Sequence, residues 1–290
     1  MVYMNTYLST MKLLNQAQDV QIKPTPTPTM TPTYNPTISP TRVPTPAPTT
    51  KEHMLRQILK EYLDPHEHFA GTKAWYWLVE TDTVFTAERD EYEYVERYVA
   101  AHIYFQLNGK NWKINPNFID GSTHHCQWHR KETHDKDFLG IRCDNESNTV
   151  THLDLAENKV SGSIPSELAA FSGLISLNLY QNEIHDNLPK EIGSLSNLQE
   201  IELGHNGLVG NLPTEIGQLV ELSILNIPWN QLQGSIPTEV AELIALTRLS
   251  FAWNQLTGQI PILPSGLLDC WLYKNQFSET SNAALLGCHI

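Results

Sequence analysis

The chain has 290 residues and a net charge of −13, which is long enough for one large or two small domains. The charge is uneven, because residues 150–290 carry 14 acidic and 4 basic residues. Such an acidic region argues against nucleic acid and against an anionic membrane surface as partners. No stretch approaches the roughly 20 apolar residues that cross a bilayer, so we expect no direct membrane insertion.

The first 50 residues are expected to form a disordered tail. Residues 24–50 contain nine prolines and ten threonines with a single charge, Arg42. Such a segment cannot bury a core and favours an extended, polyproline-like chain. Outside a cell it would be typical of an O-glycosylated stalk, and inside a cell of a linker or a phosphorylated tail.

Residues 51–149 are expected to form a helical cap region that contains one pair of cysteines. Apolar residues at helical spacing predict a helix over 51–63 and a second helix over 90–107, which Asn108-Gly109 ends. Between them, the aromatic run Trp75-Tyr76-Trp77-Leu78 is expected to lie in the core. The apolar stripe of the second helix consists of Tyr94, Val95, Tyr98, Val99, His102 and Phe105.

Residues 150–290 repeat with a period of 24 residues. Each unit has apolar residues at its first, fourth and sixth positions, and stacked units can bury apolar faces that a single unit cannot. The ninth position is occupied by Asn158, Asn182, Asn206, Asn230 and Asn254, and a sixth, shorter unit keeps Asn275. We expect these amides to turn inward and to bond backbone groups along a ladder.

The repeat resembles the plant-type leucine-rich repeat, L-x-x-L-x-L-x-x-N-x-L-x-G-x-I-P. That resemblance implies an α/β leucine-rich repeat solenoid of six repeats, a short right-handed arc with a parallel concave sheet. The segment Cys126-x-Trp128 and Gly140-Ile141-x-Cys143 resembles the amino-terminal cap of plant-type leucine-rich repeat receptor-like proteins. Upstream landmarks, among them Glu96-Arg97-Tyr98-Val99-Ala100, resemble leucine-rich repeat proteins of diatoms most closely. About ten polar residues between Trp128 and Gly140 depart from that pattern.

Four cysteines bracket the repeats, one pair before them and one pair at their end. Paired cysteines at both ends of a solenoid favour cap disulfides and an oxidising compartment, and buried thiols in a cytosolic protein are the alternative. The cap resemblance implies a Cys126–Cys143 bond. Cys270 takes the inward-pointing fourth position of the last unit, and the tail must cover the open end, so we expect Cys288 to reach it.

No motif in the sequence demands catalysis or a cofactor. The nucleophile elbow, the H-E-x-x-H pair and the phosphate loop are all missing from the sequence. Six residues with zinc-ligand chemistry lie close in sequence: His124, His125, Cys126, His129, His134 and Cys143. Their spacing matches no compact zinc finger, so we expect no metal. We expect N-glycosylation at Asn145, which opens an N-x-S acceptor.

The concave face is the predicted binding surface, because the third, fifth, seventh and eighth positions of each unit point to it. The candidate ligand-binding residues are Tyr180, Glu200, Glu202, His205, Trp229, Trp253, Trp271 and Tyr273. Packing does not require tryptophan at the eighth position of two successive units, and exposed aromatic groups often mark binding sites. The alternative is that the two rings only stack on each other and stabilise the coil.

Together with the resemblance, these features predict a non-enzymatic recognition module that binds a protein, peptide or glycan. We expect a monomer that is extracellular or displayed at the cell surface, with a natural start that lies upstream of Met1. The alternatives are an inhibitor of a secreted enzyme such as a glycosidase, a structural or adhesive cell-wall protein, and an intracellular scaffold.

Overall fold

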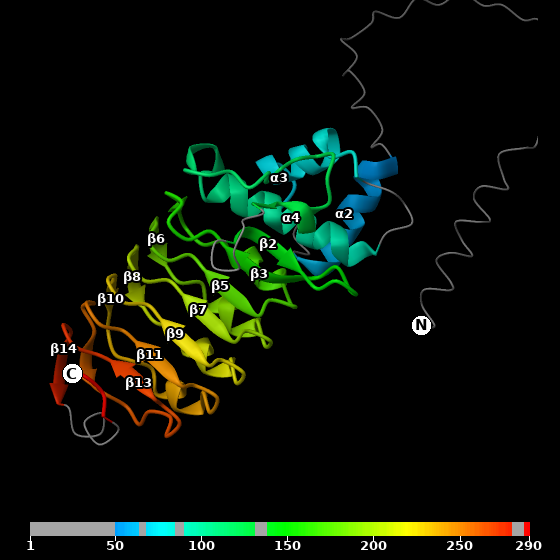
Figure 1. Ribbon diagram of the computed structural model, residues 1–290. Helices are drawn as coiled ribbons and strands as arrows, with labels where there is room; N and C mark the ends of the chain where they lie inside the picture. Colours follow the sequence, from blue (N-terminus) through cyan, green and yellow to red (C-terminus); the bar gives the residue numbers. More distant parts are fainter. Residues whose placement is uncertain (1–49, 64–67, 85–89, 131–137, 280–286) are drawn as a thin grey trace, which may run out of the picture. The chain divides into compact units, whose positions relative to one another are not determined.

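The repeats coil into a solenoid whose concave side is a single sheet. In the computed structural model, which describes residues 50–63, 68–84, 90–130, 138–279 and 287–290, this sheet has the order β1-β2-β3-β5-β7-β9-β11-β13. Figure 1 shows its strands side by side. The described residues fall in the unit Ala47–Ile290. The Thr/Pro-rich segment and His134 lie outside them.

The six repeats supply the parallel part of this sheet. Its strands are β3 (Val150–Asp154), β5 (Ser176–Asn178), β7 (Glu200–Glu202), β9 (Ile224–Asn226), β11 (Arg248–Ser250) and β13 (Asp269–Trp271). The register joins equivalent repeat positions, as in the run Leu153, Leu177 and Ile201. The fold predicted from the 24-residue period is therefore confirmed.

A second, outer sheet was not predicted. Its strands are β4 (Ser161–Gly162), β6 (Glu183–Asn187), β8 (Gly207–Asn211) and β10 (Gln231–Gln233), and β12 (Thr257–Gln259) pairs with β14 (Gln276–Glu279). After each of the first four repeat prolines a short 3₁₀ helix closes the coil; these are η5 (Ser166–Ala170), η6 (Lys190–Ser194), η7 (Thr214–Gln218) and η8 (Thr238–Glu242). Most coils of the solenoid therefore have three sides: an inner strand, an outer strand and a 3₁₀ helix.

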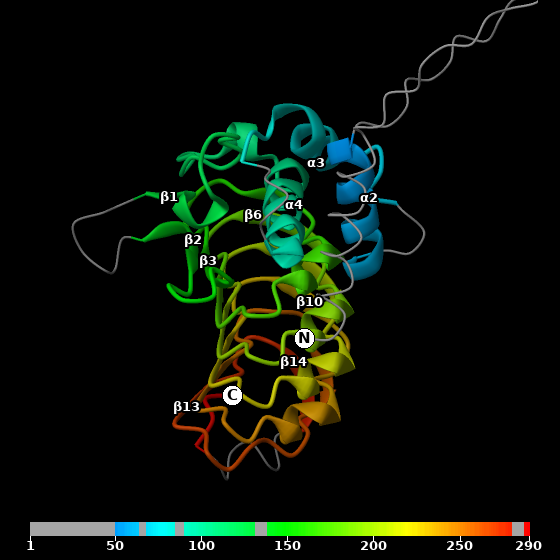
Figure 2. The same cartoon turned by 90° about the vertical axis from the view of Figure 1, so that its right-hand side faces the viewer.

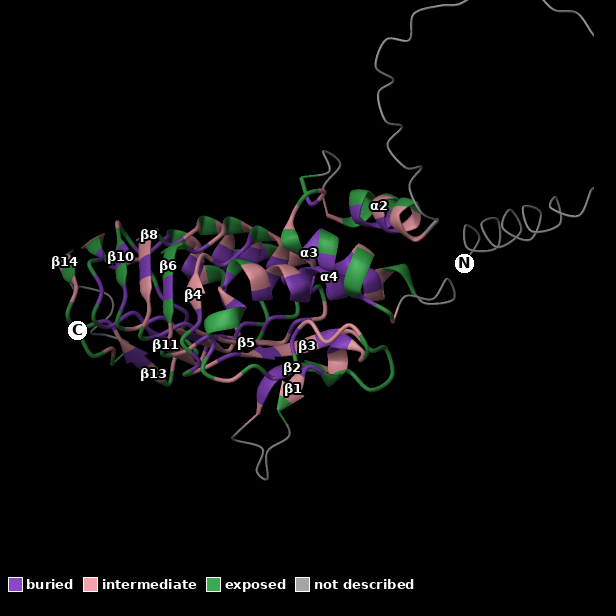
Figure 3. Ribbon diagram, turned by 90° about the horizontal axis from the view of Figure 1, so that it is seen from above, coloured by how far each residue is buried: buried purple, intermediate pink, exposed green. Residues whose placement is uncertain are grey.

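The apolar repeat positions fill the space between these sides. Figure 3 colours the ribbon of buried residues purple. The asparagine ladder is present in every described coil. In the second coil, for example, Asn182 Nδ2 donates to the carbonyl oxygen of Leu155 in the preceding coil at 2.8 Å. Its Oδ1 accepts from the N–H groups of Asn158 and Val160 at 3.0 and 2.9 Å. The ladder therefore satisfies backbone groups that the turn leaves unpaired.

Helices of the cap region lie over the amino-terminal end of the solenoid (Figure 2). They are α2 (Thr50–Tyr62), α3 (Lys73–Tyr76), the π-helical turn Trp77–Thr81 and α4 (Glu91–Gln106). Asp90 caps α4 by accepting from the N–H of Tyr92, as acidic residues at a helix start often do. Both predicted long helices are thus present, with ends within one residue of the predicted ones.

Two expectations for the cap region were wrong in detail. Tyr76 points outward with 54% of its surface exposed, because the short α3 buries only its neighbours Ala74 and Trp75. In α4, His102 and Phe105 are only partly buried. The helix is instead enclosed on most sides, since the cap surrounds it, and it buries polar as well as apolar residues.

Arg97 on α4 is a buried charge of the cap region. Its guanidinium makes two hydrogen bonds to Asp82, of 2.8 and 2.7 Å, and both side chains are almost fully buried. It also lies 5.2 Å from the ring of Trp77 and 4.9 Å from that of Trp128. A planar cation suits a slot between two indoles, so Arg97 links three segments of the cap.

Both predicted disulfides are confirmed. Cys126 bonds Cys143 on β2 (Leu139–Cys143), and the strands β1 (His129–Arg130), β2 and β3 run antiparallel. Cys270 bonds Cys288, whose Cα lies 4.5 Å away, and the tail pairs with β13 through His289. The bonds tie one cap to each end of the solenoid. Within the part of the chain described, no helix has both the length and the apolar character needed to span a membrane.

Candidate ligand-binding face

The eighth position of each repeat places its side chain in a left-handed backbone turn. The residue there has a φ between 52 and 61° in all six coils. Residues with a Cβ enter this region at a cost of roughly 1–2 kcal/mol. Every coil makes this turn whatever residue occupies its eighth position. The repeat itself therefore imposes the turn, just before the inward-turning asparagine. In three successive coils the residues are His205, Trp229 and Trp253.

These three rings form one column, which we call the aromatic stack. The ring of His205 lies parallel to that of Trp229 at 5.2 Å, and Trp229 lies parallel to Trp253 at 4.0 Å with an angle of 11°. Tyr180 meets His205 edge-on at 5.3 Å. At the other end, the ammonium of Lys274 lies 5.3 Å from the centre of the Trp253 ring.

The stack covers the faces of the two indoles and leaves their edges open. Trp229 has His205 on one face and Trp253 on the other, while Trp253 lies between Trp229 and Lys274. Nevertheless 43% of Trp229 and 37% of Trp253 is exposed. The two indoles therefore present a ridge of ring edges to solvent, because rings 24 residues apart stack more favourably than they lie flat.

A shallow groove of about 270 Å³ runs beside the aromatic stack. It is lined by Tyr180, His205, Asn226, Pro228, Trp229, Ser250, Ala252, Trp271 and Tyr273. The seventh position of the repeats explains its shape, because Pro228 and Ala252 are small and lie between the two tyrosines. The stack borders one side, and the fifth-position residues Asn226 and Ser250 border the other. Its volume is near the lower end for ligand sites, enough for one or two side chains.

Acidic residues occupy the concave face next to the groove. Asn226 Nδ2 donates to Glu202 Oε1 at 2.9 Å, and Ser176 Oγ donates to Glu200 Oε2 at 3.1 Å. Burial raises the pKa of Glu202 above its ordinary value, although the bond from Asn226 opposes the shift. Burial also raises the pKa of Asp154. A partly desolvated acid gains from a nearby cation, so this side of the groove favours positive charge.

The structure brings together five of the eight predicted residues, since Tyr180, His205, Trp229, Trp271 and Tyr273 line the groove. Trp253 stacks on Trp229, Glu202 bonds Asn226, and Glu200 lies on the same strand as Glu202 without lining the groove. Sequence reasoning missed Asn226, Pro228, Ser250 and Ala252. The available signal was the run of three small residues, Gly204, Pro228 and Ala252, between the two tyrosines in the seventh-position column.

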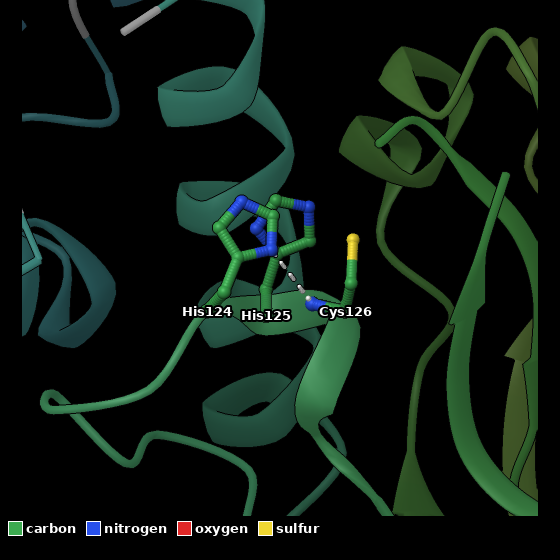
Figure 4. Close-up of side chains that lie close together, drawn as sticks. All are labelled: His124, His125 and Cys126. Atoms are coloured by element: carbon green, nitrogen blue, oxygen red, sulfur yellow. Dashed lines mark hydrogen bonds between the residues drawn. The ribbon is translucent and has the colours of Figure 1, made fainter. Parts of the chain in front are cut away.

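Among the described residues, the histidine cluster in the cap region includes a cysteine that cannot bind a metal. Figure 4 shows His124, His125 and Cys126 close together, and their ligand atoms lie within 4.8 Å of one another. The sulfur of Cys126, however, is part of a disulfide and is not free to ligate. The Nε2 atoms of His124 and His125 each lie 3.3 Å from a carboxylate oxygen, of Glu93 and Glu96 respectively. These contacts fasten the loop to α4.

Comparison with known proteins supports the repeat assignment. The family model described as Leucine Rich Repeat matches residues 149–171 and 197–219. Among curated proteins, none matches this chain. A solved structure of a TDR receptor is 34% identical over 44% of this chain and 22% of its own, with a TM-score of 0.41.

Two solved structures superpose more closely. The Arabidopsis receptor kinase HAESA, solved with the peptide hormone IDA and the co-receptor SERK1, is 29% identical with a TM-score of 0.50. The match covers 62% of this chain and 30% of that one. A plant ice-binding protein is 26% identical over 63% of this chain and 56% of its own, with a TM-score of 0.54.

The chain spans about a quarter of the length of the first receptors that it matches, 22% and 26% of their chains. The comparisons therefore identify the type of repeat. The chain is built of leucine-rich repeats, and the solved structures it resembles include plant leucine-rich repeat receptors.

Proposed function

We propose that the chain is a non-enzymatic recognition module that binds a peptide, or an extended segment of a protein, on its concave face. The groove beside the aromatic stack carries this proposal. Core packing does not require its aromatic residues, because the first, fourth and sixth repeat positions already fill the interior. Half-exposed aromatic rings around a small depression are typical of the anchoring part of an interface.

The same geometry favours a peptide over a glycan. A sugar ring binds tryptophan by lying against a ring face, and both faces of Trp229 and of Trp253 are already covered. Ring edges and a narrow groove instead suit an extended chain that inserts one side chain. The likeness to HAESA, whose solved complex contains a peptide hormone, agrees with this choice.

We also propose that the chain is extracellular or lies at the cell surface. All four cysteines of the chain are paired in disulfides, and such bonds persist in oxidising compartments. We propose that the chain binds its ligand as a monomer. The finer resemblance of the cap region to diatom leucine-rich repeat proteins stays a prediction. A second candidate is an inhibitor of a secreted enzyme, because the acids Asp154, Glu200 and Glu202 would suit a basic partner surface.

The test uses the full chain and a phage-displayed library of random peptides. Peptides enriched on the chain are synthesised, and their affinities are measured by titration. The double variant Trp229→Ala with Trp253→Ala should weaken binding by roughly 30-fold or more, the loss typical of interface anchors. It should keep the far-ultraviolet circular dichroism of the parent, since neither ring lies in the core.

The matched control replaces two exposed apolar residues outside the groove, Ile244 and Leu268, which are 79% and 83% exposed. Ile244→Ala with Leu268→Ala should leave the affinity unchanged. Failure to enrich any peptide, or equal binding by the tryptophan double variant, would contradict peptide recognition at this face. Loss of activity of a secreted glycosidase on adding the chain would favour the inhibitor instead.

A further inference from the structure

In the first two coils, the fifth position of the repeat follows one rule. There a short polar side chain accepts a hydrogen bond from the backbone N–H two residues further on. Asp154 Oδ1 accepts from the N–H of Ala156 at 3.0 Å, and Asn178 Oδ1 accepts from that of Tyr180 at 3.1 Å. This turn is common for Asp and Asn, and it satisfies the side-chain oxygen internally.

The fourth coil breaks this rule. Its fifth position is Asn226, but the residue two further on is Pro228, which has no N–H to donate. Accordingly Asn226 Oδ1 is buried and has no hydrogen-bond partner among the residues that the structure describes. Buried acceptors without partners are rare in proteins, so this one needs an explanation. Asn226 and Pro228 both line the groove, so the unpaired acceptor belongs to a side chain of the candidate binding site, and Oδ1 itself has almost no exposed surface in the unbound chain.

The neighbours of Asn226 define what this acceptor would bind. On one side its amide donates to Glu202, so the carboxylate increases the negative charge on Oδ1. On the other side its register partner is Ser250, whose hydroxyl makes no hydrogen bond within the described chain. Two unpaired oxygens and a carboxylate therefore lie on three adjacent strands, β7, β9 and β11.

The basic residues near the groove do not cancel its negative charge. Arg248 lies on the same strand as Ser250, but its Nε is 3.6 Å from Asp269 Oδ2, which offsets its charge. The ammonium of Lys274 lies over Trp253, on the far side of the stack from His205. Residues 150–290 as a whole carry ten more acidic than basic residues (14 minus 4).

Resting on the function proposed above, we propose that the groove recognises an arginine side chain of the bound peptide, which donates to Ser250 Oγ and, once the Asn226 side chain turns toward the groove, to Asn226 Oδ1. A guanidinium has five N–H donors and no acceptor, so it can donate to both oxygens. It is also planar and packs well beside aromatic rings, here those of Trp271 and Tyr273 at the end of the groove.

Pro228→Ala tests the inference without removing any ring or charge. It restores an N–H two residues after Asn226, which should bond Oδ1 as in the first two coils and so withdraw the acceptor from the ligand. Peptides selected on the full chain should contain a recurring arginine. Their affinity for Pro228→Ala should fall by about tenfold, the loss expected for one hydrogen bond to a charged group.

Two further comparisons separate charge from shape. Replacing the recurring arginine of the peptide by citrulline, which keeps the size but loses the charge, should weaken binding to the parent chain. Glu202→Gln should reduce the preference for arginine over citrulline. The matched control, Glu215→Gln at the start of the outer helix η7, should leave that preference unchanged.

The outcomes distinguish this inference from the function on which it rests. Enriched peptides that need Trp229 and Trp253 but lack a recurring basic residue would overturn the arginine site and leave peptide recognition standing. Recurring arginine with undiminished binding to Pro228→Ala would overturn the role of the Asn226 acceptor. A library that yields no binding peptide would remove both.

Discussion

Asn206 occupies the middle of the asparagine ladder, and we expect Asn206→Leu to destabilise the chain strongly. Its Nδ2 donates to the carbonyl oxygens of Leu179 at 2.9 Å, Leu203 at 3.2 Å and Gly204 at 3.3 Å. Its Oδ1 accepts from the N–H of Ile184 at 3.0 Å. The bonds with Leu179 and Ile184 join the third coil to the second, so the variant loses the contacts that hold neighbouring coils in register.

The expected loss of stability follows from the hydrogen bonds that each backbone group keeps in the variant. The Leu179 carbonyl retains a bond from Asn182 Nδ2 at 3.0 Å, but the buried N–H of Ile184 loses its acceptor. A stranded buried group costs about 1–3 kcal/mol, and each lost bond contributes about 1 kcal/mol. Two inter-coil bonds and one stranded N–H together give roughly 3–5 kcal/mol, a large part of the 5–15 kcal/mol typical of a folded domain.

Urea unfolding followed by circular dichroism measures this difference. The control is Glu215→Gln on the outer side of the same coil, whose effect should stay below about 0.5 kcal/mol. A similar loss of stability in both variants, or none in Asn206→Leu, would show that the ladder does not stabilise the solenoid as proposed. A changed slope of the transition would instead indicate partial unfolding of the solenoid.

Three more predictions concern the cap region and the ends of the chain. Burial raises the pKa of Glu96 from 4.5 to about 8, so its contribution to stability is fully present below about pH 4.5 and is lost as the pH rises toward 8. Glu96→Gln should therefore flatten the pH dependence of unfolding over this range, and an unchanged profile would contradict it. Cys270→Ala with Cys288→Ala opens a loop of 18 residues and should lower the free energy of unfolding by about 3 kcal/mol, whereas an unchanged urea midpoint would argue against the bond. Asn145 is exposed, and Asn145→Gln should abolish the mass shift that glycosidase treatment produces in secreted material.

Much of this fold can be read from the sequence because it is repetitive. A 24-residue period places equivalent residues on top of one another, so Leu153, Leu177 and Ile201 had to share one core column. The same argument placed the ladder asparagines inward and aligned Trp229 with Trp253. The pairing of Cys270 with Cys288 followed from the need to cover an open end, since a bare end exposes apolar surface.

The cap region was less predictable, because it has no repeat to impose a pattern. Spacing identified α4 but assigned it a single buried stripe, whereas Glu96 and Arg97 also lie inside. Their partners, Asp82 and His125, come from segments 15 and 29 residues away in sequence. No periodic signal connects such residues, so a buried polar network of this kind is visible only once the chain has folded.

The sequence by itself determined which side chains face the concave surface, and the tertiary structure decided how they are arranged there. Alignment in one column did not settle whether the indoles lie flat or stack, because that choice depends on neighbours in adjacent coils such as His205 and Lys274. The effect of Pro228 on the hydrogen bonding of Asn226 was likewise not visible in the sequence. A proline in a repeat looks harmless in sequence, and only the hydrogen bonds of the other coils show that it leaves Asn226 without its donor.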